Sequence, residues 1–157
     1  MDEAKSCVIA EAFLLADMPQ EAARYFERAR EVGKRIGTEH GFSSVECRAC
    51  LGLAQVATMG GRDAEAVELL QQALAAASLN KQKDSMQELA VLSSLTNALF
   101  KTHAIQEVEK LLPRYQEAAM AESRRKGLPT YVMDTLYANA RLHEVRNPFR
   151  LLGPCFH

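Results

Sequence analysis

Residues 64–73 read AEAVELLQQA, and the same order of small and bulky apolar residues occurs at two other places in the chain. Residues 20–29 read QEAARYFERA, and residues 106–112 read QEVEKLL. Alignment superimposes three residues that are 44 and 42 positions apart, namely Ala22, Ala66 and Val108. A nearly constant period of this length is typical of arrays of helical hairpins, in which each unit packs only on its neighbours. The sequence therefore predicts an all-α repeat fold.

Seven helices are predicted, because apolar residues recur at helical spacing through nearly the whole chain. Their expected spans are residues 3–16, 20–36, 42–59, 63–79, 85–101, 104–125 and 130–145. The first six helices pair into three hairpins, and the seventh is a terminal helix. We expect one repeat domain over residues 1–145 and an irregular tail over residues 146–157, which contains two prolines and a glycine.

Four residues predict where helices begin, end or bend. Gly37 and Gly41 are expected to bracket a turn. Asp63 is the expected N-cap of its helix, because an aspartate at that position can accept a hydrogen bond from an unpaired backbone N–H group. Pro113 lies inside helix 104–125, where a proline removes a backbone hydrogen bond, so it is expected to kink or split that helix.

Residue size within the repeated motif has a packing explanation. Ala22 and Ala66 are small, which lets the second helix of a hairpin approach the first. Phe26 and Leu70, one turn later, are expected to fill the space toward the next hairpin.

The middle unit resembles the tetratricopeptide (TPR) repeat family. In that unit Leu51-Gly52 is followed by Gly61, Ala66 and Ala73, which is similar to the family's skeleton of leucine, glycine and alanine positions. The 44- and 42-residue periods resemble the longer units of kinesin light chain and of TPR scaffolds for spindle orientation and receptor clustering.

The TPR resemblance covers about residues 3–122 and implies a right-handed superhelix of three hairpins, followed here by the terminal helix. It also implies that the first helix of each hairpin lines a concave groove in which partner peptides or helices dock. The third unit departs from the family pattern, because Thr102-His103 replaces the glycine-containing turn.

A second, fainter resemblance involves residues 73–79 and 87–96, which are similar to the last repeats of the cohesin-loader scaffold subunit. It spans only about 40 residues, and helices rich in alanine and leucine match one another easily.

The composition is that of an ordinary globular domain, with 157 residues, 48% hydrophobic and 25% charged. A net charge of −1 gives no long-range attraction to nucleic acid or to a membrane. No window is apolar enough for a membrane span, and the acidic N-terminus does not resemble a signal peptide. The expected location is the cytoplasm, with the nucleus as the alternative.

Charge is uneven along the chain. Residues 123–157 carry six basic and two acidic side chains, whereas residues 1–122 carry thirteen basic and eighteen acidic ones. This basic end has two explanations. Either the basic residues are stabilised by the helix dipole near a helix C-terminus and the rest belong to a solvated tail, or they form a surface on which an acidic partner docks. Dispersed charges without interleaved aromatic residues are not a nucleic-acid footprint, so no nucleic acid is expected.

Cys47 and Cys50 form a Cys-x-x-Cys motif. A zinc site needs four ligands, and the remaining candidates, Cys155 and His157, lie about a hundred residues away. A thioredoxin-like motif needs a preceding strand, and none is predicted. We therefore expect structural cysteines, with Cys50 facing helix 63–79, and no metal.

The remaining motifs do not predict an enzyme. The four histidines are scattered, no Ser, His and Asp grouping occurs at a recognisable spacing, and no glycine-rich phosphate loop is present. No catalytic residue and no cofactor are expected.

The TPR resemblance places one set of side chains in the partner-binding groove. They are Glu11, Arg48, Leu51, Gln55, Met59, Asn97 and Phe100. This lining is mixed, with Arg48 as its main cation, and would fit a segment with apolar anchors and one acidic contact. Chaperone-binding TPR domains hold a terminal carboxylate with a lysine, asparagine and arginine clamp, and the corresponding positions do not match it: Cys7, Glu11, Gly52, Ala90 and Ser94.

The predicted function is a protein-interaction scaffold or adaptor that binds a protein or peptide segment. The alternatives are a regulatory, peptide-sensing TPR domain of a larger protein, or the scaffold subunit of a chromatin or cohesin-loading complex.

Both ends of the array are expected to expose apolar side chains and to favour self-association, because no further hairpin covers them. At the first helix these are Val8, Ile9 and Leu15; at the last helix they are Tyr131, Val132, Met133, Leu136, Tyr137 and Val145. The tail could act as a substitute cap through Phe149, Leu151, Leu152 and Phe156.

Overall fold

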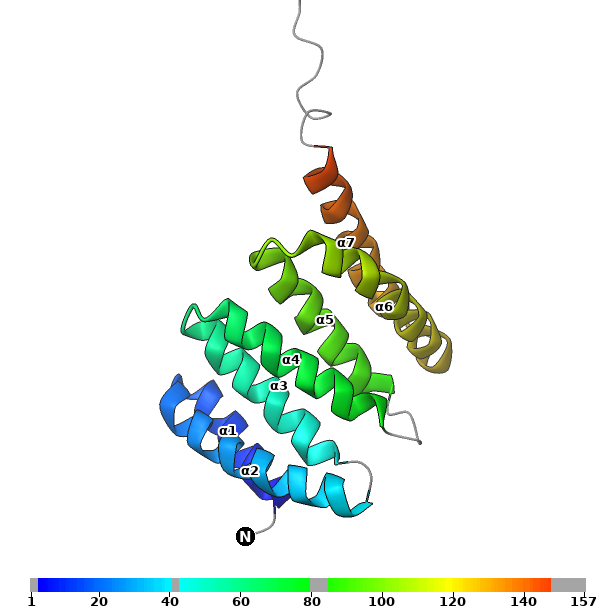
Figure 1. Ribbon diagram of the computed structural model, residues 1–157. Coiled ribbons are helices and arrows are strands. Elements are labelled where there is room, and N and C mark those ends of the chain that lie inside the picture. The colour runs from blue at the N-terminus through cyan, green and yellow to red at the C-terminus, as the bar shows by residue number, and fades with distance from the viewer. Residues whose placement is uncertain (1–2, 41–42, 80–84, 148–157) are drawn as a thin grey trace, which may run out of the picture.

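The computed structural model describes residues 3–40, 43–79 and 85–147, and these form seven α-helices without a strand. The helices are α1 (Glu3–Leu15), α2 (Pro19–His40), α3 (Ser44–Met59), α4 (Asp63–Ser78), α5 (Ser85–Lys101), α6 (Ile105–Lys126) and α7 (Thr130–Arg146) (Figure 1). The all-α prediction is therefore confirmed for the described residues.

The helices pack in the order in which they occur in the chain. Each helix contacts the next one, and in addition α1 contacts α3 and α3 contacts α5. Figure 1 shows the hairpins α1–α2, α3–α4 and α5–α6 following one another, with α7 beside α6 at the far end. The helices α1, α3 and α5 thus form one layer, and α2, α4 and α6 form the other.

The turns inside the three hairpins share one geometry. Asp17, Gly61 and His103 each adopt a positive φ, of 57°, 71° and 58°, and they are spaced by the same 44 and 42 residues as the helical motif. The following N–H group in each turn donates to the carbonyl five residues earlier: Met18 to Phe13, Arg62 to Ala57 and Ala104 to Leu99, each at 2.9 Å. This is the helix-ending pattern of a Schellman motif. The sequence repeat is therefore also a structural repeat, and Thr102-His103 preserves the turn without a glycine.

The structure agrees with the packing roles predicted for Ala22, Ala66 and Phe26. Ala22 and Ala66 are fully buried, and Phe26 is buried against Gly52 of the next hairpin. A Cβ atom at Gly52 would lie 2.3 Å from the Phe26 ring, so the ring fits only because Gly52 has no side chain.

Two predicted helix boundaries are wrong. α2 continues through Gly37 to His40, so Gly37 does not begin a turn. Close packing of α2 on α3, near Glu46, favours the extra helical turn. Gly41, the other residue expected to bracket the turn, lies outside the described residues. Asp63 is the first residue of α4 rather than its cap, because Arg62 occupies the N-cap position without a side-chain hydrogen bond. The Asp63 carboxylate lies instead 3.6 Å from the Lys101 ammonium group of α5.

Pro113 does not split its helix, because α6 runs unbroken from Ile105 to Lys126. Of the two outcomes expected from the sequence, the split is therefore wrong, and the kink stays a prediction. Pro113 is exposed, while Leu112 and Tyr115 beside it are buried. Core contacts on both sides of the proline therefore hold the two halves of α6 together despite the missing hydrogen bond.

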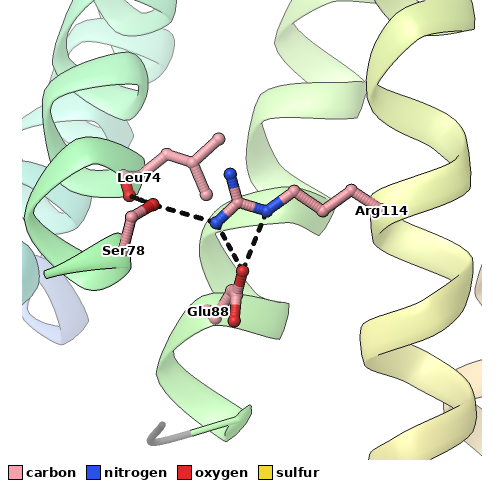
Figure 2. A network of polar contacts seen from close by, with 4 residues as sticks. All are labelled: Leu74, Ser78, Glu88 and Arg114. Carbon is pink, nitrogen blue, oxygen red and sulfur yellow. Dashed lines mark hydrogen bonds and ion pairs between the residues drawn. The ribbon is translucent and has the colours of Figure 1, made fainter. Parts of the chain in front are cut away.

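Arg114 of α6 links three helices at the junction between the second and third hairpins (Figure 2). Its guanidinium donates to the Glu88 carboxylate of α5 at 2.5 and 2.9 Å and to the Ser78 hydroxyl of α4 at 2.9 Å. The Ser78 hydroxyl in turn donates to the Leu74 carbonyl at 2.6 Å. These bonds help to fix the position of α6 relative to α4 and α5.

Candidate functional site

Three adjoining cavities follow the layer formed by α1, α3 and α5. The central cavity, about 330 Å³, lies between α3 and α5. A second cavity of about 350 Å³ extends toward α1 and shares Leu51 with the first, and a third of about 190 Å³ extends toward α7 and shares Asn97 with it. We call these three cavities together the groove.

The central cavity combines an apolar floor with a polar rim. Leu51, Ala54 and Leu70 contribute apolar surface. The amides of Gln55 and Asn97 are exposed on facing helices, and among the described residues neither makes a hydrogen bond within the chain. An unpaired amide has donors and an acceptor available for a ligand backbone.

At the α1 end, Arg48 is already paired. Its Nε and one terminal nitrogen donate to the two carboxylate oxygens of Glu11, both at 2.6 Å. This two-bond ion pair raises the pKa of Arg48, with the Glu11 hydrogen bond as the main cause. Arg48 was expected to be the cation that contacts an acidic residue of a partner. In the structure, its positive charge is instead paired with Glu11 of the same chain.

At the α7 end, Phe100 lies beneath an arginine. Phe100 is only 5% exposed, and the Arg141 guanidinium carbon lies 4.2 Å from the centre of its ring. The Tyr137 ring, one turn earlier on α7, lies 6.0 Å from the same guanidinium carbon. Phe100 therefore supports the groove wall, and the surface available to a partner here is that of Arg141.

Tyr115 closes the bottom of the α7 end. It is buried, and burial raises the pKa of its hydroxyl, while a hydrogen bond with Ser93 lowers it and the Asp134 charge raises it further. Asp134 of α7 lines the same cavity.

The structure brings the predicted groove residues together in one surface. Six of the seven line the cavities, namely Arg48, Leu51, Gln55, Met59, Asn97 and Phe100. The seventh, Glu11, lines none of them and pairs with Arg48. Sequence reasoning missed the contribution of α7, namely Asp134, Tyr137 and Arg141. Their spacing of three and four residues was a usable signal, because it places them on one helix face.

The Cys-x-x-Cys motif lies inside the protein rather than in the groove. Cys47 and Cys50 are buried against Ala73, Ala76 and Ala77 of α4, which confirms the predicted orientation of Cys50. Burial raises the pKa of the Cys50 thiol to about 11. Within the described residues, no three His, Cys, Asp or Glu side chains are grouped as metal ligands. Cys155 and His157 lie outside the described residues.

The basic end is partly neutralised from within. Arg125 pairs with the buried Glu122 carboxylate at 2.6 Å, Lys126 lies 3.4 Å from the same group, and Arg146 pairs with Glu109 of α6. For these three of the six basic side chains, the contacts favour the explanation as basic residues near a helix C-terminus.

Six of the nine apolar side chains predicted to be exposed at the two ends are exposed, namely Val8, Leu15, Met133, Leu136, Tyr137 and Val145. The other three, Ile9, Tyr131 and Val132, are half-buried. Leu15 is 91% exposed on the first hairpin, and Met133 and Leu136 are 61% and 54% exposed on α7. The proposed capping segment, residues 148–157, lies outside the described residues.

No protein-family model matches the chain, and no curated protein is significantly similar to it. Among the helices of the described residues, none combines the length and hydrophobicity of a transmembrane helix.

Proposed function

We propose that this chain is a protein-interaction scaffold or adaptor that binds a segment of a partner protein in the groove. The observation that carries this proposal is the succession of three neighbouring cavities, which share the lining residues Leu51 and Asn97 and extend from α1 to α7. An elongated groove suits an extended or helical segment, whereas a small molecule is usually bound in one enclosed pocket.

The lining supports a peptide as the ligand. Apolar side chains of a segment would be buried against Leu51, Ala54 and Leu70. The Gln55 and Asn97 amides would pair with its backbone, because a carboxamide can donate and accept at once.

We also propose that the hairpins form a right-handed, TPR-like superhelix and that the protein acts in the cytoplasm, with the nucleus as the alternative. The common turn geometry at 44- and 42-residue spacing supports the repeat assignment. The function proposed here involves no catalysis, cofactor or nucleic acid.

The test is a selection of random twelve-residue peptides, displayed on phage, on the full chain. The recovered peptides are labelled with fluorescein, and their affinity is measured by anisotropy for wild type and for the variant with Gln55→Ala and Asn97→Ala. Because both amides are exposed, the variant should keep the wild-type melting temperature. We expect binding to weaken about tenfold, as for the loss of two hydrogen bonds of about 0.5–1.5 kcal/mol each.

Gln72→Ala is the matched control, since Gln72 is an exposed amide on α4 that lines none of the three cavities. Recovery of no binder, or of binders that tolerate the groove variant as well as the control, would show that the groove is not the binding surface.

A further inference from the structure

We infer that the α7 end of the groove is a subsite for a carboxylate, in which Arg141 binds an aspartate or glutamate side chain of the partner segment. This inference rests on the function proposed above, and it adds the chemistry and the direction of the bound segment.

The geometry of Arg141 suits this role. Its guanidinium carbon lies 4.2 Å from the centre of the buried Phe100 ring, a distance at which cation–π attraction restricts the position of the arginine. Arg141 makes no hydrogen bond or ion pair with another described residue, so its N–H edge is open to a ligand. That edge is the part that forms two parallel hydrogen bonds to a carboxylate.

The charge balance of the groove selects Arg141 among its cations. Arg48 is held by Glu11 at 2.6 Å, and Lys101 lies 3.6 Å from Asp63. Among the described residues that line the three cavities, Arg141 is the basic side chain without a carboxylate partner. A carboxylate bound there would supply the missing counter-charge.

Asp134 gives the subsite a direction. It precedes Arg141 by two helical turns on the same face of α7, which places the two about 10 Å apart along the axis. Like-charge repulsion from Asp134 disfavours an acidic residue at the Tyr115 side of the cavity. The acidic residue of the partner is therefore expected near the C-terminal ends of α5 and α7.

The size of the subsite fits one side chain. Its volume is about 190 Å³, below the roughly 300–1,000 Å³ of sites that hold a whole small molecule. Because it shares Asn97 with the central cavity, a segment that occupies the central cavity can place one side chain in it.

The test uses the selected peptides, synthesised with amidated C-termini so that their only carboxylates are side chains. Each Asp or Glu is replaced in turn by Asn or Gln, and every peptide is measured against wild type, Arg141→Gln and Arg124→Gln. Arg124 is the matched control, because it is an exposed arginine of α6 outside the three cavities. We expect one peptide residue whose neutralisation weakens binding to wild type about tenfold.

The same peptide change should have no effect on binding to Arg141→Gln, because two groups in contact are coupled in a double-mutant cycle whereas distant, independent groups have additive effects. Arg141→Lys keeps the charge and the stem but loses the planar fork, so it should retain part of the acidic preference. Melting temperatures of all variants show whether loss of the stacked arginine affects folding, and Arg141→Lys keeps the test valid if Arg141→Gln is unstable.

Binders without an acidic preference, or an equal loss in wild type and Arg141→Gln, overturn the carboxylate subsite. If those same binders remain sensitive to Gln55→Ala and Asn97→Ala, the groove function stands. Failure to recover any peptide overturns both.

Discussion

Gly33 and Gly37 lie one turn apart on α2, but their surroundings differ. A Cβ atom at Gly33 would lie 2.6 Å from the backbone nitrogen of Glu46, whereas one at Gly37 would meet only the flexible Glu46 carboxylate at 3.3 Å. We expect Gly33→Ala to lower the free energy of unfolding by about 1–3 kcal/mol through overpacking. Gly37→Ala should raise it by up to about 1 kcal/mol, because alanine favours a helix.

Urea denaturation of the two variants measures this pair directly, and each serves as the control for the other. Equal effects would mean that α2 does not approach α3 at Gly33 as closely as the structure shows.

The buried Cys50 thiol makes stability depend on alkaline pH. Its pKa is raised from 9.0 to about 11 in the folded chain, chiefly by burial. Between these values the unfolded chain has lost the proton and the folded chain has kept it, so the free energy of unfolding falls as pH rises. The expected loss by pH 11 is about 2 kcal/mol.

Urea denaturation at pH 7, 9 and 10.5, for wild type and Cys50→Ala, isolates this contribution. All other groups titrate equally in the two proteins. If wild type has the larger free energy of unfolding at pH 7, its advantage over Cys50→Ala should therefore shrink as pH rises. A difference that stays constant would contradict the shifted pKa.

At the scale of the elements, the three hairpin turns are natural controls for one another. Gly61 has a φ of 71° and no atom within 4 Å of a built Cβ, so Gly61→Ala tests the backbone conformation alone. His103 holds the same conformation with a side chain. His103→Gly should therefore stabilise the protein by about 0.5–1 kcal/mol, while Gly61→Ala should destabilise it by about 1 kcal/mol.

Thermal or urea unfolding of both turn variants checks this prediction. Stabilisation by Gly61→Ala would be incompatible with the left-handed turn shared by the hairpins.

Pro113 is a weak point within α6 that the tertiary structure tolerates. It donates no hydrogen bond to the Glu109 carbonyl one turn earlier, and it is exposed. Pro113→Ala should restore this bond and raise the free energy of unfolding by about 1–3 kcal/mol. Hydrogen exchange at residue 113 and its neighbours should show new protection; an unprotected amide there would indicate that α6 stays distorted without the proline.

At the scale of the whole molecule, the exposed face of α7 predicts self-association. Met133 and Leu136 are 61% and 54% exposed, and no other helix of the described residues covers them. An uncovered apolar helix face favours association with a second copy or another protein. We expect a mass above the 17.4 kDa monomer in light scattering at high concentration.

Met133→Glu combined with Leu136→Glu should return the mass to that of the monomer. Leu79→Glu is the control, since Leu79 is 63% exposed at the end of α4, away from both ends of the array. A wild-type protein that remains monomeric at every concentration would refute the prediction.

The amino-acid sequence alone determined the helices, the repeat and most of the groove lining. Helical periodicity and turn signals are local, so they survive in any context, and α5 was predicted with the bounds that the structure shows. The resemblance to TPR repeats, rather than the period itself, pointed to Leu51, Gln55 and Asn97 as groove residues, and all three line the central cavity. The errors occurred where packing overrides local preference, as in the unbroken α6 around Pro113.

Only the tertiary structure decided which charges remain available. Glu11 and Arg48 are 37 residues apart in different hairpins, and Arg141 and Phe100 belong to α7 and α5. Such pairs depend on how far one helix is rotated and shifted against another, which a local residue pattern does not encode. For this reason the groove cation expected at Arg48 lies at Arg141, on a helix that sequence reasoning had treated only as the end of the array.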